Sequence, residues 1–293
     1  MLASLSHRLP TTILSRFHST HRLVHGSSVP SLRALSSTAT LPSTVHLDVH
    51  YEPSRRIRYT DALAMQRWKQ RELFQPPGDD SNNNHIHDGL LLLEHPSVYT
   101  LGRRSTLENL RFDPHDSNCP HDLVRVERGG EVTWHGPGQL VGYPVMSLAR
   151  GNRKKDLHWF LRQIEQVIIN VLAEYDLIGE RDEAGTGVWV DNKKIAAIGL
   201  SASKWVTMHG FSFNVAPDMA HFDSIVACGI EGRGVTSFHC LNRQVDMDQV
   251  AQSVVRQFGI VFDQEKNTVH GNQVYPDCRE WERELFQTLP VDR

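Results

Sequence analysis

The residues most suited to chemistry gather in one glycine-rich stretch, Arg128-Gly129-Gly130-Glu131-Val132-Thr133-Trp134-His135-Gly136-Pro137-Gly138-Gln139. Four glycines and a proline in twelve residues are unfavourable in the interior of a strand or a helix. They suit a backbone that approaches a ligand closely, because no Cβ shields the peptide N–H groups. The arginine, histidine and glutamine beside the glycines favour a binding site over an ordinary β-turn.

A second candidate is Cys228, which lies between an apolar run and Gly229. A single cysteine is more often a buried hydrophobic residue than a nucleophile. A catalytic cysteine needs a nearby cation or hydrogen-bond donor that lowers the pKa of its thiol, and Lys194, His135 and His209 are the candidates. The backbone N–H groups of Cys228 and Gly229 are plausible donors to an oxyanion. The cysteines form no C-x-x-C pair and fit no zinc spacing, so the sequence predicts no metal site.

The elements that position these residues follow from the hydrophobic periodicity. Helices are predicted over residues 59–74, with Thr60 or Asp61 as N-cap, over 156–175, with Asp156 as N-cap, and over 246–258. In the second helix the apolar stripe leaves Glu165 and Glu174 on the polar side. Apolar runs and alternation predict strands at 45–51, 90–94, 98–101, 123–126, 132–135, 140–145, 188–190, 195–200 and 205–215.

The predicted fold class is α+β, a mixed β-sheet with covering helices. Hairpins cluster instead of alternating strictly with helices, which disfavours a doubly wound fold. The glycine stretch matches neither G-x-G-x-x-G nor the P-loop, which disfavours a dinucleotide fold and an NTPase. The net charge of -3 at pH 7 does not suggest nucleic-acid binding, and no apolar run reaches the length of a transmembrane helix.

The chain is predicted to divide into three parts. Residues 1–45 contain no Asp or Glu, four arginines and many serines, which is typical of an organelle transit peptide. Residues 46–270 form a single domain, in which residues 75–88 are a surface loop rich in Pro, Gly, Asp and Asn. Residues 271–293 are a weakly patterned tail.

Read together, these segments resemble the lipoyl(octanoyl) transferase family of lipoate biosynthesis, also called lipoate-protein ligase B. The glycine stretch, continued through Leu140-Val141-Gly142-Tyr143, is similar to the family's signature. Further similar segments are 93–102, 187–190 with 194–199, 205–215 and 228–230, so the resemblance covers about residues 58–262. It implies a fold like the biotin/lipoate protein ligase catalytic domain, itself similar to class II aminoacyl-tRNA synthetases.

The resemblance also implies a reaction: octanoyl transfer from octanoyl-acyl carrier protein to a lysine of lipoyl domains, without ATP and without a cofactor. By analogy Cys228 is the nucleophile that forms an acyl-thioester, and Lys194 lowers the pKa of its thiol and moves the proton. The implied acyl pocket consists of Arg128, Gly129, Gly130, Glu131, Val132, Thr133, Trp134, His135, Ala197, Ile198, Gly199, Gly210, Phe211 and Ser212.

The implied acceptors are lipoyl domains of 2-oxoacid dehydrogenase complexes and the glycine cleavage H protein, and the implied location is the mitochondrial matrix. No nucleic acid and no membrane insertion are expected. Because these protein substrates are typically acidic, we expect a basic docking rim formed by Arg150, Arg153, Lys154, Lys155, Lys193 and Lys204.

One departure from the family pattern is Ala227, which precedes the cysteine where the family has proline. Three other functions compete with octanoyl transfer. An ATP-dependent lipoate or biotin ligase would need no thiol, and a lipoyl amidotransferase would take its acyl group from an acylated protein. A non-catalytic acyl-protein scaffold would not need Cys228 and Lys194 together.

Overall fold

The structure is a computed structural model that describes residues 47–53, 55–75, 87–116, 122–182, 185–226, 233–262 and 269–271. All of them belong to one compact unit, Leu35–Arg293. The predicted transit peptide, most of the 75–88 loop, almost all of the predicted C-terminal tail and Cys228 lie outside the described residues.

A mixed eight-stranded β-sheet is the centre of the described part of this unit, with the strand order β11-β1-β2-β6-β10-β9-β8-β7. Neighbours pair in parallel from β11 to β2 and antiparallel from β2 to β7. The strands are β1 (Leu47–Tyr51), β2 (Asp88–Leu93), β6 (Gln139–Val145), β7 (Glu180–Asp182), β8 (Gly185–Val190), β9 (Lys193–Ser203), β10 (Val206–Asn214) and β11 (Val269–Gly271).

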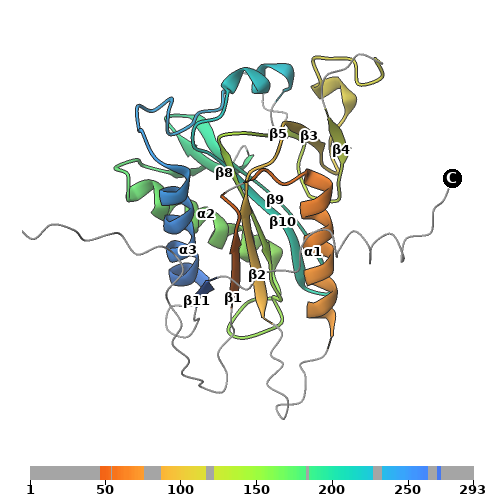
Figure 1. The fold of residues 1–293 in the computed structure, drawn as a ribbon, viewed down its shortest axis with the longest axis vertical. Coiled ribbons are helices and arrows are strands. Elements are labelled where there is room, and N and C mark those ends of the chain that lie inside the picture. Colours follow the sequence, from red (N-terminus) through yellow and green to blue (C-terminus); the bar gives the residue numbers. More distant parts are fainter. Residues whose placement is uncertain are drawn as a thin grey trace, which may run out of the picture. The chain divides into compact units, whose positions relative to one another are not determined.

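Helices cover both faces of this sheet (Figure 1), which confirms the α+β prediction. Helices α2 (Leu157–Ala173) and α3 (Met247–Phe262) pack on one face, and α1 (Tyr59–Phe74) packs on the other. Strand β2 shows why the sheet needs both layers. Leu90 and Leu92 join the core with α2 and α3, whereas Leu91 and Leu93 join the core with α1. A strand buried on both faces therefore appears in the sequence as a continuous apolar run.

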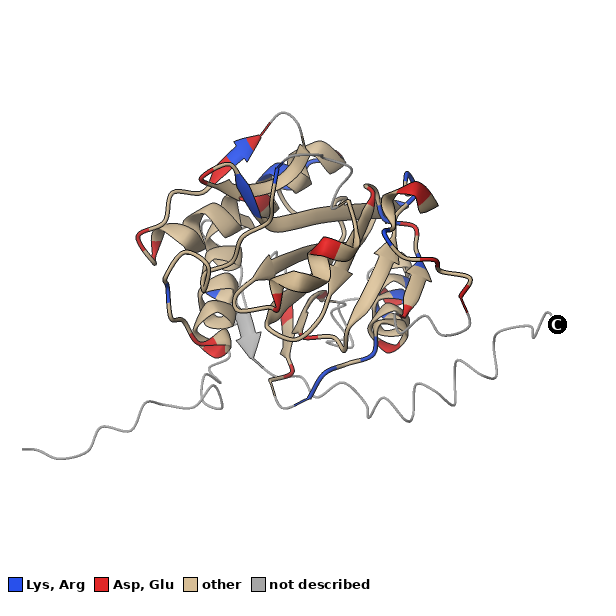
Figure 2. Ribbon diagram, turned by 90° about the horizontal axis from the view of Figure 1, so that it is seen from above, with Lys and Arg blue, Asp and Glu red and all other residues tan. Residues whose placement is uncertain are grey.

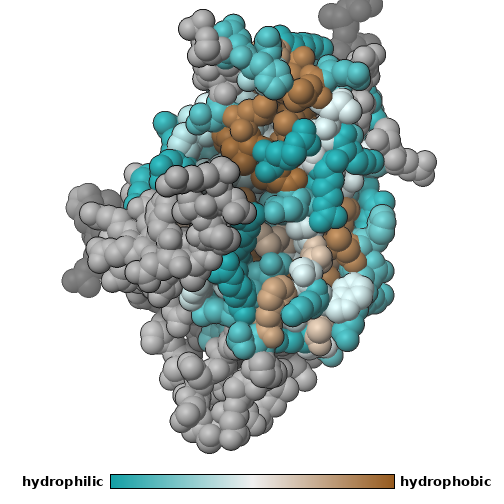
Figure 3. Space-filling model, turned by 90° about the vertical axis from the view of Figure 1, so that its right-hand side faces the viewer, coloured by the Kyte–Doolittle hydropathy of each residue, from teal (hydrophilic) through white to brown (hydrophobic). Residues whose placement is uncertain are grey.

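A smaller three-stranded sheet, in the order β4-β3-β5, carries the start of the glycine stretch. Its strands are β3 (Val98–Leu101), β4 (Leu123–Arg125) and β5 (Val132–His135). The predicted succession of strand, glycine turn, short strand, loop and strand is confirmed as β4, β5 and β6. Figure 3 shows that the face bearing α1 is mostly hydrophilic, with apolar side chains gathered in its upper part.

The predicted helices are present, but the predicted N-cap of α1 was wrong. Asp156 caps α2 as predicted, because its side chain accepts hydrogen bonds from the backbone N–H groups of His158 and Trp159. The N-cap of α1 is Arg58, which makes no side-chain capping bond. Glu165 does not face solvent, since it is 1% exposed. Periodicity placed it on the polar side of the helix, but other segments of the chain cover it there.

Candidate active site

A cavity of about 350 Å³ lies where the glycine stretch meets strands β6, β9 and β10. Tyr59 of α1 and the first turns of α2 complete its wall. Twelve of the fourteen predicted pocket residues line it: Arg128, Gly129, Gly130, Glu131, Thr133, His135, Ala197, Ile198, Gly199, Gly210, Phe211 and Ser212. The tertiary structure therefore brings three segments distant in sequence to one cavity.

The other two predicted pocket residues, Val132 and Trp134, point away from the cavity. They pack in the apolar core of the small sheet, where the Trp134 ring stacks on His221 at 4.6 Å between ring centroids. Successive side chains of a strand point to opposite faces, so Thr133 and His135 face the cavity and Val132 and Trp134 cannot. Only every second side chain of strand β5 can therefore line the cavity.

Arg128 holds the loop that begins the glycine stretch. Its buried guanidinium donates from Nη2 to the carbonyl of Thr100 at 2.8 Å and to Oγ1 of Thr100 at 2.9 Å. Its Nη1 donates to the carbonyls of Glu131 at 2.8 Å and Gly129 at 3.1 Å. The planar fork of five donors can serve all of these acceptors at once. Arg128 therefore ties the loop to β3 from inside the cavity wall.

Glycines allow this loop to lie directly on strand β9. The N–H of Gly129 donates to the carbonyl of Leu200 at 2.9 Å. A Cβ on Gly199 would lie 2.9 Å from the carbonyl oxygen of Gly129, closer than almost any real contact. Gly130 has φ of +91°, a conformation that other residues rarely adopt. The close backbone approach that these glycines make is to strand β9, whereas the sequence predicted one to a ligand.

The wall near α1 consists of buried tyrosine and histidine side chains, with His95 packed behind Tyr59 and Tyr143. His95 contacts the carbonyl of Ile57 at 2.6 Å through Nδ1 and the hydroxyl of Tyr143 at 2.7 Å through Nε2. The hydroxyl of Tyr59 lies 3.5 Å from Nδ1 of His209. Nothing in the sequence indicated Tyr59 as a cavity residue, and Tyr143 appeared only as the end of the family signature.

Burial keeps this wall uncharged at neutral pH. Desolvation lowers the pKa of His95 and of His209 to about 4 and lowers the pKa of His135 well below its usual range. Desolvation likewise raises the pKa of Tyr59 to about 12 and that of Tyr143 well above its usual value. Neutral histidines and tyrosines are compatible with an acyl chain, which carries no charge.

Lys194 is a buried cation on the opposite side of the cavity from α1. It is 4% exposed, and its Nζ donates to the carbonyl of Thr186 at 3.1 Å. The same Nζ lies 4.8 Å from the centroid of the Trp189 ring, a cation–π distance. The Trp189 ring also faces Arg233 at 4.3 Å. Lys194 is therefore held with its ammonium group in a restricted position at the cavity wall.

Lys194 and His209 cannot both serve the same thiol. His209 pairs with Leu200 across β9 and β10. Leu200 lies six positions from Lys194 along β9, which amounts to roughly 20 Å at the usual strand rise. His209 also has φ of +60°, which departs from strand geometry, and its ring lies beside Tyr59. Lys194 and His209 therefore lie at opposite ends of the cavity.

Cys228 itself lies outside the described residues, but both flanks of its segment are described. Phe222, before it, and Val235, after it, line a small cavity together with Lys194. The backbone N–H of Lys194 donates to the carbonyl of Gly234 at 3.0 Å. The chain therefore re-enters the described part beside Lys194, whereas Val226, the last described residue before Cys228, donates its N–H to the carbonyl of Asn109 at 2.8 Å.

The predicted basic docking rim does not form a single surface. Arg153 pairs with Asp88 in the interior, and both side chains are buried. Lys204 lies in the turn between β9 and β10, at the opposite end of β9 from Lys193. In Figure 2 the Lys and Arg residues alternate with Asp and Glu around the periphery of the fold. The expectation was wrong because Arg153 neutralises a buried carboxylate and because strand β9 carries Lys193 and Lys204 to its opposite ends.

Among the described residues, no group of three or more His, Cys, Asp or Glu side chains is arranged to hold a metal ion. Cys240 is described and exposed. In the same part of the chain, no helix has the length and apolar character needed to cross a membrane.

Comparisons with known proteins agree with this geometry. The family model "Lipoyl protein ligase A/B catalytic domain" matches residues 58–259. An octanoyltransferase of Nostoc sp. is 50% identical over 200 residues, which cover 68% of this chain and 87% of the relative. The chloroplastic octanoyltransferase LIP2p2 of Arabidopsis thaliana is 45% identical over 215 residues, covering 69% and 75%.

The fold is also similar to that of a solved protein. The bipartite lipoate protein ligase of Thermoplasma acidophilum, studied with its E2 lipoyl domain, matches with a TM-score of 0.61 and 17% sequence identity. The match covers 84% of this chain and 93% of that one. At this identity the similarity concerns the fold.

Proposed function

Because the chain belongs to the lipoyl protein ligase A/B catalytic-domain family, and within it to the octanoyltransferases of lipoate biosynthesis, we propose a two-step acyl transfer through Cys228. The acyl donor is octanoyl-acyl carrier protein and the acceptor is a lysine of a lipoyl domain. The observation that carries this proposal is the cavity, whose wall combines thin glycine and alanine positions, neutral aromatic residues and one buried lysine.

In the first step the Cys228 thiolate attacks the thioester carbonyl of the donor. A bond forms between Sγ and the carbonyl carbon, the bond to the phosphopantetheine sulfur breaks, and Lys194 gives a proton to that leaving sulfur. In the second step the acceptor amine attacks the acyl-cysteine, the C–Sγ bond breaks and an amide forms. Neutral Lys194 takes the proton that the amine loses, so the site returns to thiolate and ammonium.

Two features support Lys194 in this role. Its ammonium is fixed by the Thr186 carbonyl and the Trp189 ring, so it does not swing freely into solvent. Phe222 and Val235, which flank the Cys228 segment, meet it at the small cavity. The first transfer converts one thioester into another, and the second converts a thioester into a more stable amide. The scheme therefore uses neither ATP nor a cofactor.

The twelve cavity residues named above are proposed to bind the octanoyl chain, with its carbonyl toward Lys194. An extended eight-carbon chain spans roughly 9 Å at C–C bond lengths of about 1.5 Å. The stretch of β9 from Lys194 to Leu200 is roughly twice as long at the usual strand rise. A chain whose carbonyl lies at Lys194 would therefore end about halfway along this stretch of β9, near Ala197.

Residues 1–45 are proposed to direct the chain to an organelle, since they are acid-free and rich in arginine and serine. Between the mitochondrion and the chloroplast, we propose the mitochondrial matrix. The relative in Arabidopsis is named as chloroplastic. Fusing residues 1–45 to a fluorescent protein, with the unfused protein as control, tests whether the fusion accumulates in mitochondria or in chloroplasts.

The deciding experiment for the reaction is an intact-mass spectrum after brief mixing with octanoyl-acyl carrier protein, without ATP or acceptor. An octanoyl adduct on Cys228 that disappears when a lipoyl domain is added supports the two-step route. Cys228→Ala should form no adduct, whereas Cys240→Ser, at an exposed position, should behave like the wild type. Transfer that requires ATP and free octanoate would instead identify a ligase and contradict the proposal.

A further inference from the structure

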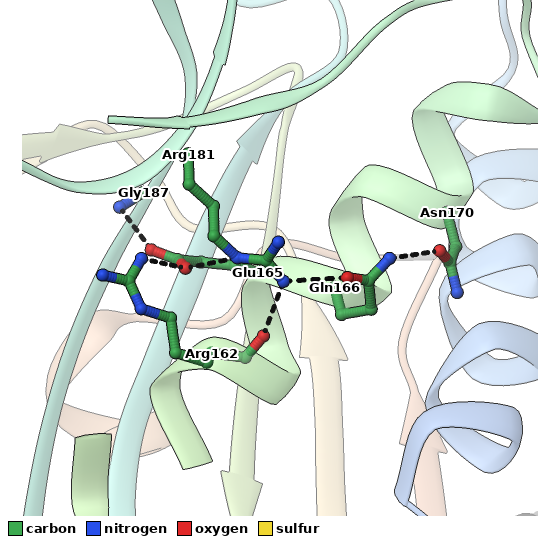
Figure 4. A network of polar contacts seen from close by, with 6 residues as sticks. All are labelled: Arg162, Glu165, Gln166, Asn170, Arg181 and Gly187. Atoms are coloured by element: carbon green, nitrogen blue, oxygen red, sulfur yellow. Dashed lines mark hydrogen bonds and ion pairs between the residues drawn. The ribbon is translucent and has the colours of Figure 1, made fainter. Parts of the chain in front are cut away.

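Glu165 is a buried carboxylate that the proposed reaction does not use. It lies on α2 and is 1% exposed. Its Oε2 accepts hydrogen bonds from Arg162 at 2.8 Å and Arg181 at 3.1 Å, and its Oε1 accepts from the backbone N–H of Gly187 at 3.4 Å (Figure 4). A carboxylate removed from water in this way is costly unless it is fully paired.

The Gly187 contact connects Glu165 to Lys194. The N–H of Gly187 and the carbonyl of Thr186 belong to the same peptide group. That carbonyl accepts the hydrogen bond from Nζ of Lys194 at 3.1 Å. The carboxylate and the ammonium are therefore bound to the two ends of one peptide, on opposite sides of strand β8.

We propose that Glu165 is a positioning residue for Lys194 and acts through the Thr186–Gly187 peptide. A negative charge at the N–H end orients the peptide dipole so that its oxygen faces the ammonium, and hydrogen bonds in series strengthen one another. This inference rests on the proposed role of Lys194 in the transfer. Lys194 thereby gains a fixed acceptor without a carboxylate beside it, which would bind the proton-transferring ammonium too tightly.

Gly187 is required for this peptide orientation. Its φ is +135°, which L-residues with a side chain rarely adopt. A Cβ at this position would lie 2.4 Å from the carbonyl oxygen of Ala196 on the neighbouring strand. The strand pairing also shifts its register just beyond, between Val188 and Trp189. This irregularity of β8 orients the Thr186–Gly187 peptide with its N–H toward Glu165 of α2 and its carbonyl toward Lys194.

The two arginines do not replace the carboxylate in this role. The side chains of Arg162 and Arg181 are 52% and 37% exposed, so they contact Glu165 from the solvent side. Arg181 also donates to Oε1 of Gln166 at 2.8 Å, and Gln166 donates to Asn170 at 2.7 Å (Figure 4). This outer part of the network does not touch the peptide, and it provides a matched control.

The test compares Glu165→Gln with Gln166→Ala. Glu165→Gln removes the charge at the N–H end of the peptide, whereas Gln166→Ala breaks two bonds of the same network and leaves that contact intact. Each protein is treated with formaldehyde and borane over a range of pH, and methylation of Lys194 is followed by peptide mass spectrometry. The adjacent exposed Lys193 is the internal reference.

In Glu165→Gln we expect the Lys194 methylation profile to move to lower pH, because the ammonium loses its oriented acceptor. Octanoyl transfer should fall about tenfold in kcat with little change in KM, the size of one hydrogen bond to a charged group. Gln166→Ala should match the wild type in both measurements. Glu165→Asp keeps the charge but withdraws it from Gly187, so it should shift the Lys194 methylation profile in the same direction. Because it retains the buried carboxylate, it provides the test if Glu165→Gln does not fold.

Folded Glu165 variants with the wild-type Lys194 profile would overturn the inference. The methylation readout needs neither Cys228 nor an acyl donor. If the Glu165 variants shift the Lys194 profile but the wild type forms no Cys228 adduct, the inference stands and the proposed reaction is rejected. If the wild type forms the adduct but the Glu165 variants leave the Lys194 profile unchanged, the reaction stands and the inference is rejected.

Discussion

Replacing Arg128 with lysine should loosen the glycine loop and weaken both stability and acyl binding. The arginine donates four hydrogen bonds of 2.8–3.1 Å, to Thr100 Oγ1 and to three backbone carbonyls. A lysine ammonium has three donors on a single nitrogen and cannot span acceptors on both sides of the loop. At least two of the four bonds should therefore be lost.

The size of the effect follows from these contacts. Hydrogen bonds to a charged group contribute about 1.5–3 kcal/mol each, so losing two should cost about 3 kcal/mol or more of unfolding free energy. For a domain of this size that is a fall in Tm of roughly 6–12 °C. Acyl binding should weaken as well, because the loop forms the cavity wall from Arg128 to Glu131.

The assay is thermal unfolding together with the KM for octanoyl-acyl carrier protein. Arg125→Lys is the matched control, since it makes the same substitution at an exposed position on the neighbouring strand β4. It should leave Tm and KM within error of the wild type. A Tm for Arg128→Lys equal to that of Arg125→Lys would refute the conclusion that the fork of Arg128 holds the loop.

Two further predictions concern the cavity and its wall. Gly199→Val should raise the KM for the acyl donor roughly tenfold or more, since even its Cβ would lie 2.9 Å from the Gly129 carbonyl oxygen and 3.0 Å from Cδ of Arg128. Gly234→Ala, whose Cβ meets nothing nearer than 3.9 Å, is the control, and equal KM values would contradict the prediction. His95 has a folded-state pKa of about 4, below its unfolded value near 6.5, so the unfolded chain binds more protons between these values and stability falls as pH drops from 6.5 to 4. Urea unfolding measures the free energy of unfolding at pH 7 and pH 5. Between these values the free energy of unfolding of His95→Gln should fall by about 2 kcal/mol less than that of the wild type. An equal fall in both proteins would show that His95 is not the group responsible.

Much of the site could be predicted from the sequence, because its elements are specified locally. The continuous apolar run of β2, the Asp156 cap of α2 and the strand–glycine–strand order of residues 123–145 depend on neighbours a few positions away. The density of glycines indicated a backbone without side chains in the way, and Gly129 lies directly on Leu200 of β9. The resemblance to octanoyltransferases was confirmed by the family model over residues 58–259 and by a relative of that name that is 50% identical over 200 residues.

The tertiary structure decided which polar groups are buried and what they contact. Glu165 belongs to the polar side of its helix by periodicity, yet Arg181 and Gly187 from two later strands cover it. Tyr59 reaches the cavity only because α1 packs against the sheet opposite α2. Periodicity within a segment specifies its type and its apolar face. The partner that compensates a buried charge comes from a distant segment, and that pairing is fixed only when the whole sheet assembles.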